Sequence, residues 1–175
     1  SRIEIRDSTC PAIHAGLQAS EKGLPFMPLR GLIGSDLMRI RGDWKESENP
    51  FEEGDRIVVL PALKPDFALF HSPFADRNGN IWLGRRRELV TMAHAAKGAL
   101  VTVEEIRDID IMEDEALAGG SLPALYVTAI AEAPKGAWPL GVAGQYEPDR
   151  EHLANYAKKA TDADGFQDYL AEHGA

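Results

Sequence analysis

Short apolar runs alternate along this chain with segments of helical periodicity, and each predicts one element of secondary structure. Three apolar runs predict strands, at 56–60, 67–71 and 99–103. The second is almost continuously apolar, as expected of a strand that is covered on both faces, and the third is expected to be buried. A weaker fourth strand is predicted at 125–131. Asp-Arg-Asn-Gly-Asn at 76–80 signals a tight turn, so 81–83 is expected to fold back as a hairpin partner.

Four further segments carry the spacing or the end signals of helices. They lie at 11–22, 87–97, 149–160 and 164–172. Asp149 is a suitable N-cap for the third helix, and Asp162 or Asp164 for the fourth. Residues 24–55 are rich in glycine, proline and charge, so we expect irregular structure there.

The order of these elements predicts an α/β fold. Strand, helix and strand in succession indicate a mostly parallel sheet with flanking helices. No internal repeat or linker divides residues 1–175, so we expect a single domain. The chain begins at Ser1, and residues 2–6 already alternate like a half-buried strand, which usually needs neighbours. We therefore expect a processed, truncated or separately encoded chain.

Composition narrows the classes of function. With 19 basic and 28 acidic residues the net charge is −9, which disfavours a nucleic-acid partner but allows a small anion held by local arginines. No apolar run approaches the ~20 residues of a membrane span, so no membrane partner is expected. Cys10 is the only cysteine and fits a reducing, cytoplasmic setting. The five histidines lack metal-ligand spacing, so we expect no metal site.

Chemically useful residues follow the predicted strands. Ligands of open α/β sheets bind beyond the carboxyl ends of the strands, where His71, the pair Glu104-Glu105 and the loop 134–148 lie. His71 could bind a substrate carbonyl or move a proton, or it could pack at a strand end against the backbone. Adjacent carboxylates on an extended chain point in opposite directions, so they form no acid/base pair. A capping box from Thr102 to Glu105 is the favoured interpretation.

Two further features leave a functional and a structural interpretation open. Arginine side chains bind phosphate or carboxylate in a fork, so the run at 85–87 is a candidate anion site. The same run could instead be a solvated surface that pairs with acidic groups. The loop 134–148 is longer than most connections, which favours a function. From these residues alone, the chain is an α/β domain that could bind an anionic ligand.

Several segments, taken in order, carry more information than any one of them. They are GLPFMPLRG at 23–31, GSDL at 34–37, PDFALFH at 65–71, ADRNGN at 75–80, AAK at 95–97, VTVEEI at 101–106, LP at 122–123 and the loop from Ala133 to Tyr146. This ordered set resembles the α-type subunits of class I coenzyme A (CoA) transferases, nearest the glutaconate CoA-transferase group. The resemblance covers nearly the whole chain.

That resemblance implies a NagB/RpiA/CoA-transferase-like fold and an active site between two subunit types. In this family the acyl-CoA carbonyl is attacked by a glutamate of the β-type subunit, and an acyl anhydride and then a glutamyl-CoA thioester follow. We therefore expect an α-type subunit that lacks the family's N-terminal part and is inactive alone. Its expected partners are a β-type subunit, the missing N-terminal α part and acyl-CoA. Coenzyme A is then a substrate, and no tightly bound cofactor is expected.

We assign no catalytic residue to this chain. Ser20-Glu21-Lys22-Gly23 matches the β-type nucleophile motif, but it lies at a helix end within an α-type segment. Trp138 stands where the resemblance suggests histidine. The residues expected to contact substrate or CoA are His71, Arg85, Arg86, Glu105 and Trp138.

Two alternative functions remain. On the same fold, the chain could belong to an enzyme that hydrolyses a CoA thioester or opens a ring in it. The absent N-terminal part and the absent nucleophile also allow a non-catalytic assembly subunit.

Overall fold

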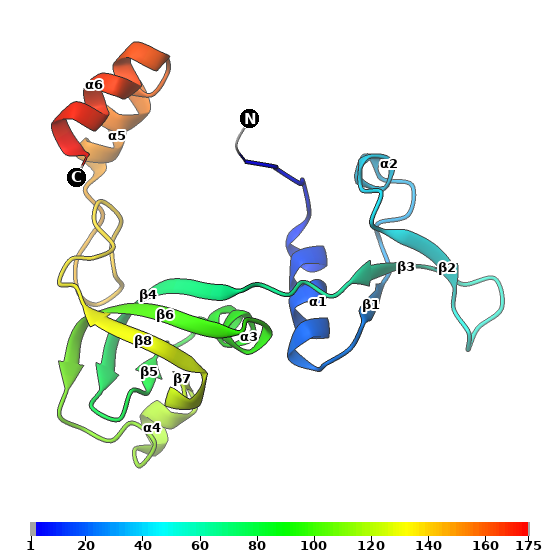
Figure 1. Cartoon of the computed structure of the whole chain (residues 1–175), viewed down its shortest axis with the longest axis horizontal. Coiled ribbons are helices and arrows are strands. Elements are labelled where there is room, and N and C mark those ends of the chain that lie inside the picture. Colours follow the sequence, from blue (N-terminus) through cyan, green and yellow to red (C-terminus); the bar gives the residue numbers. More distant parts are fainter. Residues whose placement is uncertain (1–2, 175) are drawn as a thin grey trace.

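The computed structural model describes residues 3–174, which form two β-sheets with helices packed beside them (Figure 1). The larger sheet has five strands in the order β7-β5-β4-β6-β8. These are β4 (Phe67–Asp76), β5 (Ile81–Trp82), β6 (Gly98–Arg107), β7 (Ser121–Leu122) and β8 (Val127–Glu132). The predicted α/β class is therefore confirmed.

The larger sheet is mixed, with its parallel strands on one side. β6 pairs in parallel with both β4 and β8, and α3 (Arg87–Ala95) lies between β4 and β6 in the sequence. β5 and β7 are antiparallel, because the turn at 76–80 folds β5 back onto β4. β4 and β6 are longer than the predicted runs. They continue together from the pair Phe67 and Gly98 to the pair Asp76 and Arg107.

Only one face of the parallel strands carries a core. Ala68 of β4 and Ala99, Val101 and Val103 of β6 are buried in one cluster with Ala93 of α3. The neighbouring side chains on β4 point the other way, because successive residues of a strand alternate between faces. Two of them are exposed: Phe67 by 56% and Leu69 by 73%. We expected both faces of β4 to be covered by other parts of the protein. Within residues 3–174, only the face toward α3 is covered.

The smaller sheet corrects our expectation of irregular structure at 24–55. Its antiparallel order is β1-β3-β2. Its strands are β1 (Phe26–Leu29), β2 (Lys45–Glu48) and β3 (Arg56–Pro61). The helix α1 (Cys10–Glu21) precedes them in the sequence, and the short helix α2 (Asp36–Ile40) lies between β1 and β2. The sequence of β2 is Lys-Glu-Ser-Glu, whose residues are all exposed, so no apolar alternation marks it. It becomes a strand because it pairs with the apolar strand β3.

A buried carboxylate joins the turn at 76–80 to two later segments. Asp76 is 2% exposed and accepts hydrogen bonds from the backbone and side-chain nitrogens of Asn80, at 2.9 and 2.8 Å, and from the Ile111 N–H at 3.0 Å. Asn80 in turn accepts from the Ala124 N–H at 3.0 Å. Burial raises the pKa of Asp76, but these hydrogen bonds outweigh it and keep the pKa below its usual value. The ADRNGN motif therefore has a structural role.

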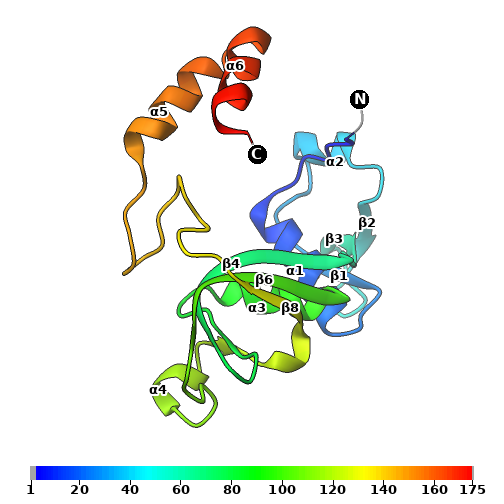
Figure 2. The same ribbon diagram turned by 60° about the vertical axis from the view of Figure 1, so that its left-hand side comes forward.

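The chain ends in a helical hairpin, α5 (Arg150–Lys159) and α6 (Ala163–His173), that projects away from both sheets (Figures 1 and 2). Asp149 and Asp162 cap the two helices by accepting hydrogen bonds from His152 N and Gly165 N, as predicted. A short helix, α4 (Glu115–Ala118), and a 3₁₀ turn (Ala124–Tyr126) were not predicted. In the described part of the chain, no helix is long and apolar enough to cross a membrane.

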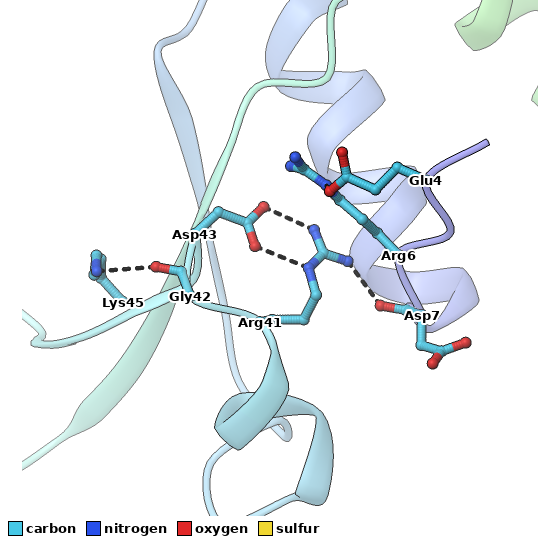
Figure 3. A network of polar contacts seen from close by, with 7 residues as sticks. All are labelled: Glu4, Arg6, Asp7, Arg41, Gly42, Asp43 and Lys45. Carbon is cyan, nitrogen blue, oxygen red and sulfur yellow. Dashed lines mark hydrogen bonds and ion pairs between the residues drawn. The ribbon is translucent and has the colours of Figure 1, made fainter. Parts of the chain in front are cut away.

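Arg41 fastens the N-terminal segment to the smaller sheet (Figure 3). Its guanidinium donates two hydrogen bonds to the Asp43 carboxylate, both of 2.8 Å, and one of 2.8 Å to the Asp7 carbonyl oxygen. The same group lies 4.4 Å from the ring centre of Trp44, and the side chain is 10% exposed. These hydrogen bonds lower the pKa of Asp43. Removing Arg41 would therefore leave several polar atoms without a partner.

We expect Arg41→Ala to lower the free energy of unfolding by about 1–3 kcal/mol, because it leaves a carboxylate and a carbonyl oxygen without their donor. Urea denaturation of the purified chain measures this. Arg39→Ala is the matched control, because Arg39 is 77% exposed and pairs with the exposed Asp36; it should change stability by less than about 0.5 kcal/mol. Equal effects of the two substitutions would contradict the assigned role of Arg41.

Candidate functional site

A histidine, a threonine and a glutamate lie together on the uncovered face of the larger sheet. His71 on β4 and Thr102 on β6 are register partners, so their side chains lie side by side. His71 Nδ1 is 2.8 Å from Thr102 Oγ1, and His71 Nε2 is 2.6 Å from Glu104 Oε1. The His71 and Glu104 side chains are only 13% and 9% exposed. His71 is thus bound to two side chains rather than to the backbone.

Glu104 also holds the loop that follows β8. One carboxylate oxygen accepts a hydrogen bond from the Tyr146 hydroxyl at 2.7 Å, and the other accepts one from the Lys135 N–H at 2.6 Å. The Tyr146 oxygen accepts in turn from the Ala137 N–H at 3.1 Å. The single carboxylate therefore joins the two central strands to both ends of the loop 134–148.

The cluster is arranged around an ionised carboxylate. Burial raises the pKa of Glu104, but the hydrogen bonds from the loop and from His71 outweigh burial and hold it below the usual value. Burial and the neighbouring carboxylate raise the pKa of Tyr146, so its hydroxyl keeps its proton and donates. With Glu104 ionised, His71 Nε2 carries a proton. In the neutral ring, Nδ1 then accepts from the Thr102 hydroxyl.

This geometry can orient an imidazole and support a proton at its Nε2 atom. A carboxylate that fixes the tautomer of a histidine is a common arrangement for general acid/base work or for hydrogen bonding to a substrate. The Glu104 carboxylate already accepts hydrogen bonds from His71, Tyr146 and Lys135. It is therefore poorly suited to act as a nucleophile itself.

Trp138 lies on the same loop, further from the sheet. Its Nε1 atom donates to Asp149 at 3.3 Å, and its ring centre is 4.3 Å from that of His152 on α5. The side chain nevertheless remains 48% exposed. Trp138 therefore connects the loop to the helical hairpin and leaves part of its ring free for contact.

The other predicted site residues lie elsewhere. Arg85 and Arg86 are exposed and immediately precede α3, the helix on the opposite face of the sheet. Glu105 points away from Glu104 and binds Arg107, with 2.8 Å between its Oε1 and the arginine Nε. The structure thus brings His71 and the loop of Trp138 together, but not these three residues.

The expected capping box at Glu105 is wrong. No helix follows there, because β6 continues to Arg107 in register with the end of β4. Sequence reasoning also missed Thr102, Glu104 and Tyr146 as members of the cluster. Strand alternation held the signal for the glutamate, since residues 102 and 104 share a face. No comparable signal identified the tyrosine in the loop.

Within residues 3–174, no group of three or more histidine, cysteine, aspartate or glutamate side chains is placed to hold a metal ion.

Comparison with known proteins finds no matching family model but several related subunits. The chain is 34% identical to the A subunit of 3-oxoadipate CoA-transferase of Pseudomonas knackmussii and 30% identical to the A subunit of glutaconate CoA-transferase of Acidaminococcus fermentans, over 98% of its length in both cases. It is 27% identical to the cholesterol ring-cleaving hydrolase IpdA subunit of Rhodococcus jostii. It spans 58–60% of the length of these relatives.

Two solved structures share the fold. Glutaconate coenzyme A-transferase from Acidaminococcus fermentans superposes on 95% of this chain with a TM-score of 0.84 at 28% identity, covering 57% of that chain. A variant of the decarboxylase AibA/AibB does so over 95% of this chain with a TM-score of 0.77 at 33% identity, covering 61% of that chain. Relatives of this fold are therefore named for more than one reaction.

We expect Glu104→Gln to lower the free energy of unfolding at neutral pH by about 1–3 kcal/mol, because hydrogen bonds to a charged acceptor are lost. The pKa of Glu104 is depressed in the folded chain, so its stabilisation is present above the unfolded pKa and disappears as pH falls through the folded value. The free energies of unfolding of Glu104→Gln and of the wild-type chain should therefore become more similar below about pH 4. Urea denaturation between neutral and acidic pH measures it.

Glu105→Gln is the matched control, because that side chain is 47% exposed and pairs with Arg107 at the surface. It should change stability little at any pH. A constant deficit of Glu104→Gln across the whole pH range would contradict the ionised state of the cluster.

Proposed function

We propose that this chain belongs to the α-type subunits of class I CoA transferases and forms one side of an active site shared with a β-type subunit. The proposed reaction moves CoA from an acyl-CoA to a carboxylic acid. The observation that carries this proposal is the match of 98% of the chain to the A subunits of two named CoA-transferases. The superposition on glutaconate CoA-transferase supports the same assignment.

In this proposal the nucleophile is a glutamate of the β-type subunit. Its carboxylate attacks the thioester carbonyl, CoA leaves as thiolate, and a mixed anhydride forms. The thiolate then attacks the glutamyl carbonyl, which releases the first acid and leaves a glutamyl-CoA thioester. The acceptor carboxylate attacks this thioester and displaces CoA as thiolate, which gives a second mixed anhydride. The thiolate then attacks the acceptor's acyl carbonyl and releases the glutamate carboxylate, so the new acyl-CoA forms and the enzyme returns to its starting state.

The carboxylates of this chain support a nucleophile on the partner. Glu104 is occupied by its hydrogen bonds to the loop and to His71. Glu21, in the segment that resembles a nucleophile motif, lies at the end of α1 with its Oε1 3.1 Å from His94 Nδ1. This chain would therefore position substrate rather than attack it.

The proposed binding residues divide into two groups. His71, whose two ring nitrogens are bound to Thr102 and Glu104, would border the acyl end of the substrate with its ring, and Trp138 would offer an aromatic wall. The exposed side chains of Arg85 and Arg86 would bind CoA phosphates, for which arginine forks are well suited. Glu105 would act only at the edge of this surface. CoA is a substrate in this proposal, without a tightly bound cofactor, and the enzyme would be cytoplasmic.

Two other functions remain in competition. Hydrolysis or ring opening of a CoA thioester is favoured by one observation, the match to a ring-cleaving hydrolase subunit over 98% of this chain. That reaction needs no transferable glutamyl-CoA intermediate. A non-catalytic assembly subunit is the third possibility, and turnover by the β-type subunit in the absence of this chain would favour it.

Incubation with acyl-CoA, followed by intact-mass analysis with and without borohydride, distinguishes these functions. We expect a borohydride-sensitive CoA thioester on the β-type partner and none on this chain. An adduct on this chain would show that one of its own carboxylates is a nucleophile. Consumption of the thioester without any adduct would replace the transferase with the hydrolase.

We expect Arg86→Ala and Trp138→Ala each to weaken CoA binding to the assembled enzyme about tenfold, because each removes one contact to the ligand. Isothermal titration with CoA and thermal melting of the same samples measure affinity and folding separately. Arg39→Ala, beside the smaller sheet, is the matched control. If either substitution lowers the melting temperature but leaves the affinity for CoA unchanged, that residue does not belong to the binding site.

A further inference from the structure

A tight turn at 133–136 lies directly against the candidate site. It closes through a hydrogen bond of 2.8 Å from the Gly136 N–H to the Ala133 carbonyl oxygen, and the Ala133 N–H donates to the Val103 carbonyl oxygen of β6 at 2.7 Å. A Cβ atom at Gly136 would lie 2.9 Å from Cε1 of His71, so a side chain would not fit there unless the turn moved. The backbone of the turn therefore rests on the His71 ring.

Lys135, inside this turn, has a left-handed backbone with a φ of 59°. It is the one non-glycine residue with a positive φ within residues 3–174. Its N–H donates to Glu104 Oε2 at 2.6 Å, so the polar cluster holds the backbone in this conformation. Glycine would adopt the same conformation without the strain that a Cβ atom introduces. A lysine at a strained position beside a candidate site indicates that its side chain has a use.

The Lys135 ammonium group is available to a ligand. The side chain is exposed, and within the described part of the chain it makes no hydrogen bond or ion pair. Two carboxylates that flank the turn already have other partners. Glu104 is held inside the polar cluster, and Glu132 accepts a hydrogen bond from the Ile106 N–H at 3.0 Å. The positive charge of Lys135 is therefore not neutralised by these neighbours.

The strands beneath the turn bring no positive charge of their own to this face. Strand register and alternation place Leu69, Leu100 and Ala129 in one row of the uncovered face, and His71, Thr102 and Ala131 in the next. Neither row contains a lysine or an arginine. Lys135 thus adds a cation to a surface that is otherwise apolar or hydrogen-bonded internally.

We propose that Lys135 binds a carboxylate of the acid substrate beside His71, and that it is a specificity-determining residue of this subunit. The inference rests on the proposed function, because that function supplies a carboxylic acid as the acceptor of CoA. An ammonium group attracts a carboxylate as a point charge, and its long flexible stem follows acids of different size. The phosphates of CoA are anions as well, so the acid and CoA have to be tested separately.

Isothermal titration of the assembled enzyme with glutarate, and separately with CoA, tests the proposal. We expect Lys135→Met to weaken glutarate binding about tenfold and to leave CoA binding unchanged, because it removes the charge but keeps most of the side chain. In turnover, KM for the acid should rise while kcat changes little. Lys135→Arg, which keeps the charge, should restore glutarate binding.

Lys22→Met is the matched control, because Lys22 is an exposed lysine at the end of α1, which packs against α3 on the other side of the larger sheet. It should bind glutarate and CoA like the wild type.

Lys135→Gly separates binding from folding. Glycine relieves the strain at a positive φ, so this variant should melt a few degrees higher than the wild type and still bind glutarate about tenfold more weakly. A lower melting temperature together with unchanged glutarate binding would show that the lysine serves the fold, and would overturn the proposal.

Three other results would overturn it: no glutarate binding by the wild-type enzyme, equal glutarate affinity of the wild type and Lys135→Met, or a loss confined to CoA. The last result would assign Lys135 to the CoA phosphates. Glutarate binding that depends on Lys135, without any transfer of CoA, would leave this inference standing and remove the proposed function. Transfer of CoA with an unchanged KM for the acid in Lys135→Met would keep the function and remove this inference.

Discussion

The parallel pairing of β4 with β6 is the constraint on which the rest of the structure depends. It runs from Phe67 and Gly98 to Asp76 and Arg107, and it places His71 beside Thr102. The alternation of both strands then assigns Ala99, Val101 and Val103 to the core under α3, and Glu104 to the opposite face. One register therefore determines both the hydrophobic core and the polar cluster. A shift of one residue would exchange the two.

Local signals in the sequence predicted the elements that form without distant partners. The apolar runs of β3, β4 and β6, the turn at 76–80 and the aspartate caps of α5 and α6 were all visible. β2 was not, because its four polar residues become a strand only beside β3. The site divided in the same way. His71 was identified from its place on a strand. Glu105 was chosen in place of Glu104, because alternation places Glu104 on the face of Thr102 but only the register with β4 shows that His71 lies beside Thr102.

The relatives share a fold while their names describe different reactions, including CoA transfer and hydrolytic ring cleavage. The polar cluster is compatible with that variety. Its carboxylate accepts hydrogen bonds from a histidine, a tyrosine and a backbone N–H, so the cluster fixes the loop beside His71. In the proposed two-subunit enzyme, chemistry that depends on a nucleophile would then differ with the residue that the β-type subunit places opposite. A shared framework of this kind can serve several reactions.

The same carboxylate links the site to the loop that leads into the helical hairpin. The hairpin of α5 and α6 contains no buried residue, and the loop before it is held by Glu104 through Tyr146 and Lys135. Trp138 stands between the two, bonded to the cap residue of α5. Trp138 and Asp149 are thus among the contacts by which the loop and the hairpin meet, and Glu104 is the group that joins the loop to His71.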